Sequence, residues 1–235
     1  MPTFQFYVDP CRYFSLYRYS ENGERQENIT DWALDLFQNE YKDKKIKKID
    51  IFYYVYAVLH NPEYRKKYEI DLKRDFPRVP LYADFWKYAE AGEKLMNLHL
   101  NYENVGIDKN IKINRLPLES LLPKRKKSET SQAEDEKLLQ KIKPEIKLKA
   151  KDGVIEIDEI TTISNIPNEV WEYKLGNRSA VEWVLDQYKP YKSSDETIQT
   201  QFNAYDFFEY KEEVIKLLLQ VIYVSVETMK IIKNL

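Results

Sequence analysis

Three side chains in the second half of the sequence have the types and spacing of a metal-dependent nuclease site. Asp158 comes before Glu172 and Lys174, which form a Glu-x-Lys pair. On neighbouring strands, two such carboxylates hold Mg²⁺ and the lysine steadies the attacking water. Short Glu-x-Lys matches are frequent in a chain with 32% charged residues, and Glu145 with Lys147 is another. The pattern leaves DNA cleavage open as an alternative function.

A second group of polar side chains surrounds Gly176. Lys174, Asn177 and Arg178 lie within two residues of this glycine. Glycine takes the backbone conformations that a sharp corner needs, and either Asn177 or Ser179 is suited to cap a following helix. The sequence therefore predicts an aromatic strand, a turn and a helix, with amide and cationic groups at the turn.

The segment Asn61–Tyr64, NPEY, resembles the Asn-Pro-Pro-Tyr loop of amino-methyltransferases. It departs from that loop at Glu63, and it follows an expected helix rather than a strand. We interpret Asn61 as the N-cap of a new helix and Pro62 as its first residue. The glycines are scattered and form no phosphate-cradling loop. We expect this chain to bind neither S-adenosylmethionine nor ATP.

Cysteine and histidine content argues against a zinc protein. Cys11 is the single cysteine, which excludes an internal disulfide framework and a multi-cysteine zinc site. His60 and His99 are expected at helix ends as hydrogen-bonded structural residues.

The N-terminus has no secretory pattern, and the longest apolar run, Ile51–Leu59, is too short to span a bilayer. We expect a cytoplasmic protein without a membrane segment.

Residues 1–116 are predicted to form an aromatic-rich, mainly helical part. The chain has 19 tyrosines, whose rings pack as apolar bodies while the hydroxyl stays polar. Thr30 is expected to begin one helix, and further helices are expected over residues 48–60 and 82–100. The prolines in Phe76–Pro80 require an extended segment between them.

The expected helix over residues 48–60 is apolar on nearly every side, as is typical of a helix buried within a domain. A helix of this kind cannot remain in water. We therefore expect its apolar residues to be mostly buried, namely Tyr53, Val55, Val58 and Leu59.

The remainder of the chain is predicted to contain a charged connection, residues 117–145, and a mixed part, residues 146–235. Alternating residues on both sides of Asp152 and Gly153 predict a β-hairpin with a favoured turn. Residues 161–166 would add a third strand, and residues 207–232 a long C-terminal helix. The predicted fold class is α+β: a helix-rich N-terminal half, then a small, mostly antiparallel sheet packed on helices.

Four motifs in a fixed order resemble the C-terminal specificity region of Type ISP restriction-modification enzymes. Trp171–Trp183, WEYKLGNRSAVEW, carries the strongest likeness. Asp50–Arg65, DIFYYVYAVLHNPEYR, resembles the family's central helical signature, and Leu72–Pro80, LKRDFPRVP, follows at the family's spacing. Val224–Met229, VSVETM, is the fourth motif and is similar to the family's C-terminal end. In addition to these four, Cys11–Tyr19 resembles the family's entry segment. Several ordered motifs are far more specific than one short pattern.

The resemblance implies a target-recognition domain that reads a short double-stranded DNA sequence, positions an adenine methyltransferase and licenses a translocase and nuclease. The chain would not be an enzyme by itself. The complete enzyme would use S-adenosylmethionine, ATP and Mg²⁺, bound by its other parts. A protein–protein docking module of the same complex, which reads no bases, is the alternative from another class.

Recognition would combine lysine and arginine contacts to phosphates with side chains that reach base edges in the major groove. The net charge of −2 shows that any basic surface must be local. The candidate DNA-binding residues are Lys174, Asn177 and Arg178 at the glycine corner, Arg65, Lys73, Arg74 and Arg78 around the proline-bounded segment, and Lys124, Arg125, Lys126 and Lys127 in the connection.

Overall fold

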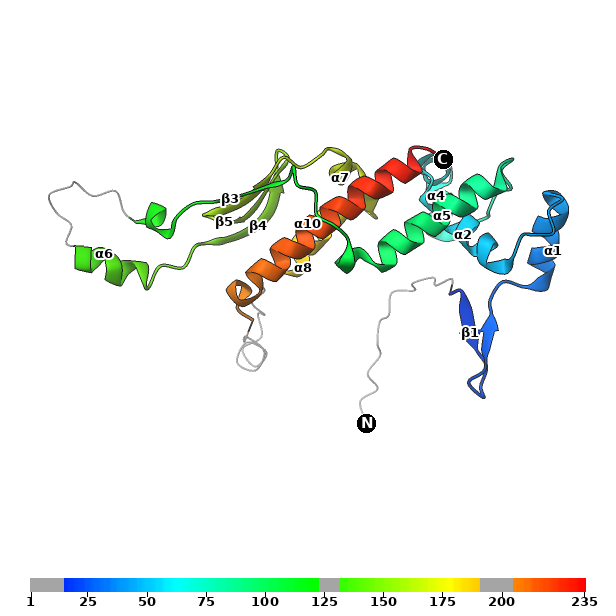
Figure 1. Ribbon diagram of the computed structural model, residues 1–235, viewed down its shortest axis with the longest axis horizontal. Coiled ribbons are helices and arrows are strands. Elements are labelled where there is room, and N and C mark those ends of the chain that lie inside the picture. Colours follow the sequence, from blue (N-terminus) through cyan, green and yellow to red (C-terminus); the bar gives the residue numbers. More distant parts are fainter. Residues whose placement is uncertain (1–14, 123–131, 191–204) are drawn as a thin grey trace. The chain divides into compact units, whose positions relative to one another are not determined.

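The computed structural model describes residues 15–122, 132–190 and 205–235 (Figure 1). The chain divides into two compact units, Met1–Asn97 together with Leu235, and Leu98–Asn234. The finer partition predicted from the sequence, with boundaries at residues 116 and 145, stays a prediction. No helix in the described part of the chain is long and apolar enough to cross a membrane.

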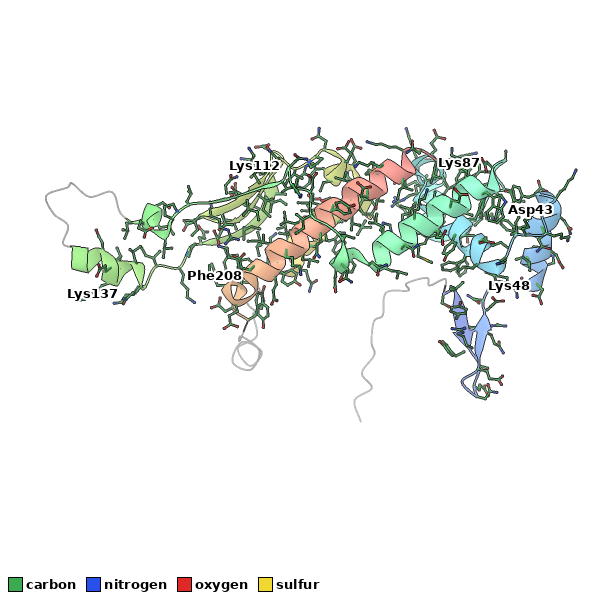
Figure 2. The ribbon with its side chains drawn as sticks, in the orientation of Figure 1. Asp43, Lys48, Lys87, Lys112, Lys137 and Phe208 are labelled. Atoms are coloured by element: carbon green, nitrogen blue, oxygen red, sulfur yellow. The ribbon has the colours of Figure 1, made fainter. Side chains whose placement is uncertain are left out.

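The N-terminal unit consists of a small hairpin followed by helices. In order along the chain, the elements are β1 (Tyr17–Tyr19), β2 (Arg25–Glu27), α1 (Asp31–Glu40), α2 (Lys48–His60), α3 (Pro62–Lys67), α4 (Glu69–Arg74) and α5 (Phe85–Leu100). Lys48, labelled in Figure 2, forms ion pairs with Glu27 at 3.2 Å and with Asp31 at 2.7 Å. Because Lys48 is the first residue of α2, these ion pairs connect α2 to the hairpin and to α1.

Helix caps in this unit lie where the sequence predicted them. Thr30 is the N-cap of α1, and its hydroxyl accepts a hydrogen bond from the Ala33 amide. Asn61 caps α3, its side chain accepting from the Tyr64 amide at 3.0 Å, with Pro62 in the first turn. The interpretation of Asn61–Tyr64 as a cap between two helices is confirmed.

Helix α5 begins three residues later than the predicted Tyr82. Both backbone polar groups of Tyr82 are engaged by tyrosine hydroxyls, since its amide donates to Tyr54 and its carbonyl accepts from Tyr41. These bonds keep Tyr82 out of a helix. The Asp84 carboxylate instead accepts from the Lys87 amide at 3.0 Å, as an N-cap side chain does.

One side of helix α2 is fully buried, and its other sides are only partly covered. Ile51, Tyr54 and Val58 are at most 2% exposed, in the core formed with α1 and α5. Of the four residues predicted to be mostly buried, Val58 is fully buried. Tyr53, Val55 and Leu59 are partly buried and none of them is exposed, so the prediction is confirmed. Full coverage nevertheless reaches only one stripe of the helix.

Tyrosine hydroxyls in the core hold the extended segment Phe76–Pro80 by its backbone. The Tyr54 hydroxyl donates to the Pro80 carbonyl at 2.8 Å, and the Tyr64 hydroxyl donates to the Arg78 carbonyl at 2.9 Å. Burial raises the pKa of Tyr54, so the hydroxyl stays protonated and able to donate. Two of the chain's tyrosines therefore hold in place a segment that cannot be helical.

The C-terminal unit is built around a four-stranded antiparallel sheet with the order β3-β6-β5-β4. Its elements are β3 (Lys112–Arg115), α6 (Gln132–Leu139), β4 (Ile146–Lys151), β5 (Val154–Asp158), β6 (Thr161–Ser164), α7 (Glu169–Glu172), β7 (Lys174–Leu175), β8 (Arg178–Ser179), α8 (Ala180–Gln187) and α10 (Phe207–Ile232).

The predicted hairpin is present as β4 and β5. Asp152 and Gly153 both have positive φ, 51° and 75°, as a two-residue turn of this type requires. Alternating apolar residues of the strands are fully buried, among them Ile155, Ile157 and Ile163. Helix α8 contacts β4, and α10 runs beside α7 and α8 (Figure 1). The predicted α+β class is confirmed.

Two ion pairs attach α10 to the sheet. Lys211 lies 2.7 Å from the Asp158 carboxylate at the end of β5 and donates a hydrogen bond to Thr161 on β6. Arg115 on β3 makes two hydrogen bonds of 2.6 Å to the Glu212 carboxylate. Asp158 is fully buried whereas Glu212 is exposed, so the first pair is the structurally important one.

Candidate nucleic-acid interface

The glycine corner is a tight hairpin that leads into α8. Strands β7 and β8 pair antiparallel, with Leu175 opposite Arg178. Gly176 between them has φ of 70°, a conformation that favours glycine. The strand expected over Tyr173–Leu175 is one residue shorter, because Tyr173 is the C-cap of the helix α7. The chain therefore passes from helix to hairpin to helix.

Ser179, rather than Asn177, caps α8. Its hydroxyl accepts from the Glu182 amide at 3.2 Å, and the Glu182 carboxylate accepts from the Ser179 amide at 2.7 Å. This capping box satisfies two backbone donors at once, and the hydrogen bonds from Ser179 lower the pKa of Glu182. Since Ser179 takes this role, the exposed side chain of Asn177 is not needed for capping.

Lys174 and Asn177 line an open hollow of about 370 Å³. The hollow also receives the β4–β5 turn, so two glycine turns distant in sequence form its walls. Its lining residues are Ala150, Lys151, Asp152, Gly153, Trp171, Lys174, Asn177 and Glu182. The sequence analysis missed Lys151, although its place directly before the Asp-Gly turn could have identified it.

Arg178 lies against α8. Its Nη1 donates to the Asp186 carboxylate at 2.6 Å, and its guanidinium carbon is 5.6 Å from the centre of the Trp183 ring. Lys189 also pairs with Asp186, at 3.1 Å. The hydrogen bonds from Arg178 and then Lys189 lower the pKa of Asp186, which is therefore ionised at neutral pH.

The candidates in the N-terminal unit are all on its surface. Lys73 pairs with Glu69 at 2.8 Å along α4, while Arg65, Arg74 and Arg78 have exposed side chains. A hollow of about 240 Å³ adjoins the segment that holds Arg78. It is lined by Tyr64, Tyr68, Asp71, Leu72, Asp75, Phe76, Pro77 and Arg78.

Four candidates, Lys124, Arg125, Lys126 and Lys127, lie outside the described residues. Their assignment as a phosphate-contacting arm stays a prediction. The DNA-binding roles of the other candidates also stay predictions.

The arrangement required by the nuclease alternative is not found. Asp158 ends β5 and is paired with Lys211, while Glu172 ends α7 and pairs with Lys233 at 3.1 Å. Lys174 is on β7, which belongs to a different sheet from β5. The neighbouring-strand arrangement that the nuclease alternative requires is therefore absent for these three residues. Within the described ranges, no cluster of His, Cys, Asp and Glu is suited to a metal ion.

Both histidines form hydrogen bonds, His60 within its own helix and His99 with a neighbouring one. His60 Nδ1 donates to the Tyr56 carbonyl at 2.7 Å, and burial lowers the pKa of His60. His99 Nε2 lies 2.8 Å from the Thr228 hydroxyl of α10. The expectation of hydrogen-bonded structural histidines is confirmed.

The chain belongs to the Type ISP C-terminal specificity domain family, whose model matches residues 1–217. This membership confirms the resemblance found in the sequence. Among curated proteins, none matches the chain.

Three solved structures that contain DNA or a DNA mimic are similar to this chain. The DrdV–DNA complex is 42% identical with a TM-score of 0.81, over 94% of this chain and 21% of that one. A nuclease-deletion mutant of the Type ISP restriction-modification enzyme LlaGI, in complex with a DNA substrate mimic, is 32% identical, with a TM-score of 0.62, over 94% and 17%. The ATP-dependent Type ISP restriction-modification enzyme LlaBIII, bound to DNA, is 27% identical, with a TM-score of 0.66, over 93% and 13%.

This chain therefore spans about a fifth or less of the length of these proteins. The domain that it represents is part of Type ISP restriction-modification enzymes.

Proposed function

We propose that this chain reads a short double-stranded DNA sequence on behalf of a Type ISP restriction-modification enzyme. Membership of the specificity-domain family carries the proposal. It is supported by the similar structures that hold DNA or a DNA mimic. Bound at its target, the domain would position an adenine methyltransferase for base flipping and license the translocase and nuclease. S-adenosylmethionine, ATP and Mg²⁺ would be bound by those other parts, in the cytoplasm.

The hollow between the two glycine turns supplies a surface for the DNA backbone. Lys151 and Lys174 are exposed, and both line it. An ammonium group attracts phosphate as a point charge and carries no sequence information. Asn177, which lines the same hollow, has an amide that can donate and accept at an adenine edge. The corner therefore combines lysines that would fix the position of the protein on the DNA backbone with side chains that would read bases.

Lys174→Ala and Lys151→Ala should each weaken binding to every duplex to a similar degree. Each lost phosphate contact should reduce the slope of log affinity against log salt by about 0.9. Fluorescence anisotropy with labelled duplexes at several salt concentrations measures this slope. Lys216→Ala, which removes an exposed lysine on α10, is the matched control. If both variants retain the slope of this control, the hollow does not hold phosphate.

The isolated chain is expected to be catalytically silent. Glu63 replaces the second proline of the methyltransferase loop, and the described carboxylates do not assemble a metal pair. Incubation of the purified chain with duplex DNA, Mg²⁺ and labelled S-adenosylmethionine should give neither cleavage nor methylation. DNA cleavage that Glu172→Ala abolishes would contradict this expectation and favour the nuclease alternative.

Binding to a library of random duplexes tests the proposed function as a whole. Salt-dependent binding with a preference for one sequence supports a DNA reader. Stable capture of a methyltransferase or translocase part without any sequence preference for DNA supports the docking module instead.

A further inference from the structure

Arg178 is held from two directions by α8. Asp186 accepts a 2.6 Å hydrogen bond from Nη1, and the Trp183 ring lies beside the guanidinium. Trp183 is itself fixed, because its indole N–H donates to the Leu175 carbonyl at 2.8 Å. Leu175 is the β7 residue opposite Arg178 in the hairpin. The side chain of Arg178 and the backbone that carries it are thus oriented by the same helix.

The Arg178–Asp186 pair is poorly placed to stabilise the fold. Their side chains are 45% and 46% exposed, so water screens the attraction between the two charges. The bond occupies one N–H of a guanidinium that has several more. The main effect of the pair is therefore to hold the remaining N–H groups of the Arg178 guanidinium in a fixed direction.

We propose that Asp186 is a positioning residue that sets Arg178 to read a guanine edge in the major groove. This inference rests on the proposed DNA-reading function. The planar fork of arginine matches the two acceptors of guanine, and orienting it before binding removes part of the entropy cost of recognition. A lysine at position 178 would not offer this fork.

Asp186 also opposes binding at wrong sequences. A carboxylate beside Arg178 occupies an N–H that would otherwise be available to any phosphate, and its negative charge repels the DNA backbone. Specificity is a difference between two affinities, so a group that disfavours the wrong partner sharpens it. Lys189, which pairs with the other oxygen of Asp186, limits this repulsion at the correct site.

The test uses the full 235-residue chain and a random-core duplex library, sequenced before and after selection. Asp186→Asn should reduce the preference at one base pair by about three- to tenfold, a part of what a good bidentate contact provides. Arg178→Lys should reduce the preference at the same base pair. Affinity for unselected duplex should stay the same or rise with Asp186→Asn, since a negative charge is removed.

Glu213→Gln, an exposed acid on α10, is the matched control for charge. It should leave the base preference unchanged, and thermal melting should show that all variants fold. If Asp186→Asn keeps the wild-type base preference while Arg178→Lys loses that preference, the role of Asp186 is overturned. The proposed function is then unaffected. Loss of preference at every position, or no effect from Arg178→Lys, also overturns the role of Asp186. A wild-type chain without any sequence preference rejects the proposed function itself.

Discussion

Replacing Lys211 with methionine is expected to destabilise the C-terminal unit by about 3–5 kcal/mol. Lys211 is the cation 2.7 Å from Asp158, whose side chain is fully buried. Methionine has a similar length but no charge, so the carboxylate would remain in the interior without its partner. Desolvation of an unpaired charge is far more costly than the loss of an exposed ion pair.

Urea unfolding followed by circular dichroism measures this effect, and hydrogen exchange by peptide assigns it to the C-terminal unit. Glu212→Gln, which breaks the exposed pair with Arg115, is the neighbouring control and should cost about 1 kcal/mol or less. Adding Asp158→Asn to Lys211→Met should recover part of the stability, because the buried charge is then gone. A Lys211→Met variant as stable as Glu212→Gln would contradict the structural role assigned to Asp158.

The pairing of Asp158 illustrates what sequence patterns leave undetermined. Its spacing from Glu172 and Lys174 suggested a metal site, yet its partner comes from α10, more than fifty residues further along the chain. The nuclease alternative requires Glu172 on a strand, but Glu172 ends α7. Short charge patterns do not specify which carboxylates meet, because tertiary packing brings distant residues together.

Local signals were more informative. Thr30, Asn61 with Pro62, and Asp152 with Gly153 each act through their own backbone neighbours, and the caps and turn that they predict are present. The start of α5 was predicted three residues early, because hydroxyls of Tyr41 and Tyr54 capture the backbone of Tyr82. No local pattern contains that information.

For the candidate interface, too, the local features were predictable from the sequence and the tertiary contacts were not. The sequence located the glycine corner, and the family resemblance is confirmed by the family match, while the role of the corner in DNA binding stays a proposal. The contribution of Lys151 depends on the β4–β5 turn lying beside the corner. The contact between Arg178 and Asp186 depends on the direction in which α8 leaves the hairpin. Both arrangements arise from tertiary packing, which no local sequence pattern specifies.

Gly92→Ala is expected to destabilise the N-terminal unit by about 3 kcal/mol or more. A Cβ atom at Gly92 on α5 would lie 1.8 Å from the backbone carbonyl oxygen of Tyr53 on α2. That oxygen belongs to a helix backbone, so no side-chain rotation can relieve the overlap. The two helices would have to separate, which would disturb the packing of Tyr54 and Phe85, whose rings stack 5.2 Å apart.

Thermal and urea unfolding measure the loss, and hydrogen exchange should show faster opening of α2 and α5. Gly106→Ala is the control, because a Cβ atom there meets nothing within 4 Å. That change should alter stability by about 1 kcal/mol or less, because alanine also restricts the unfolded chain. Because Tyr54 also holds Pro80 and Tyr82, separation of the helices should release the segment that carries Arg78. A Gly92→Ala variant as stable as Gly106→Ala would show that α2 and α5 are not packed at this distance.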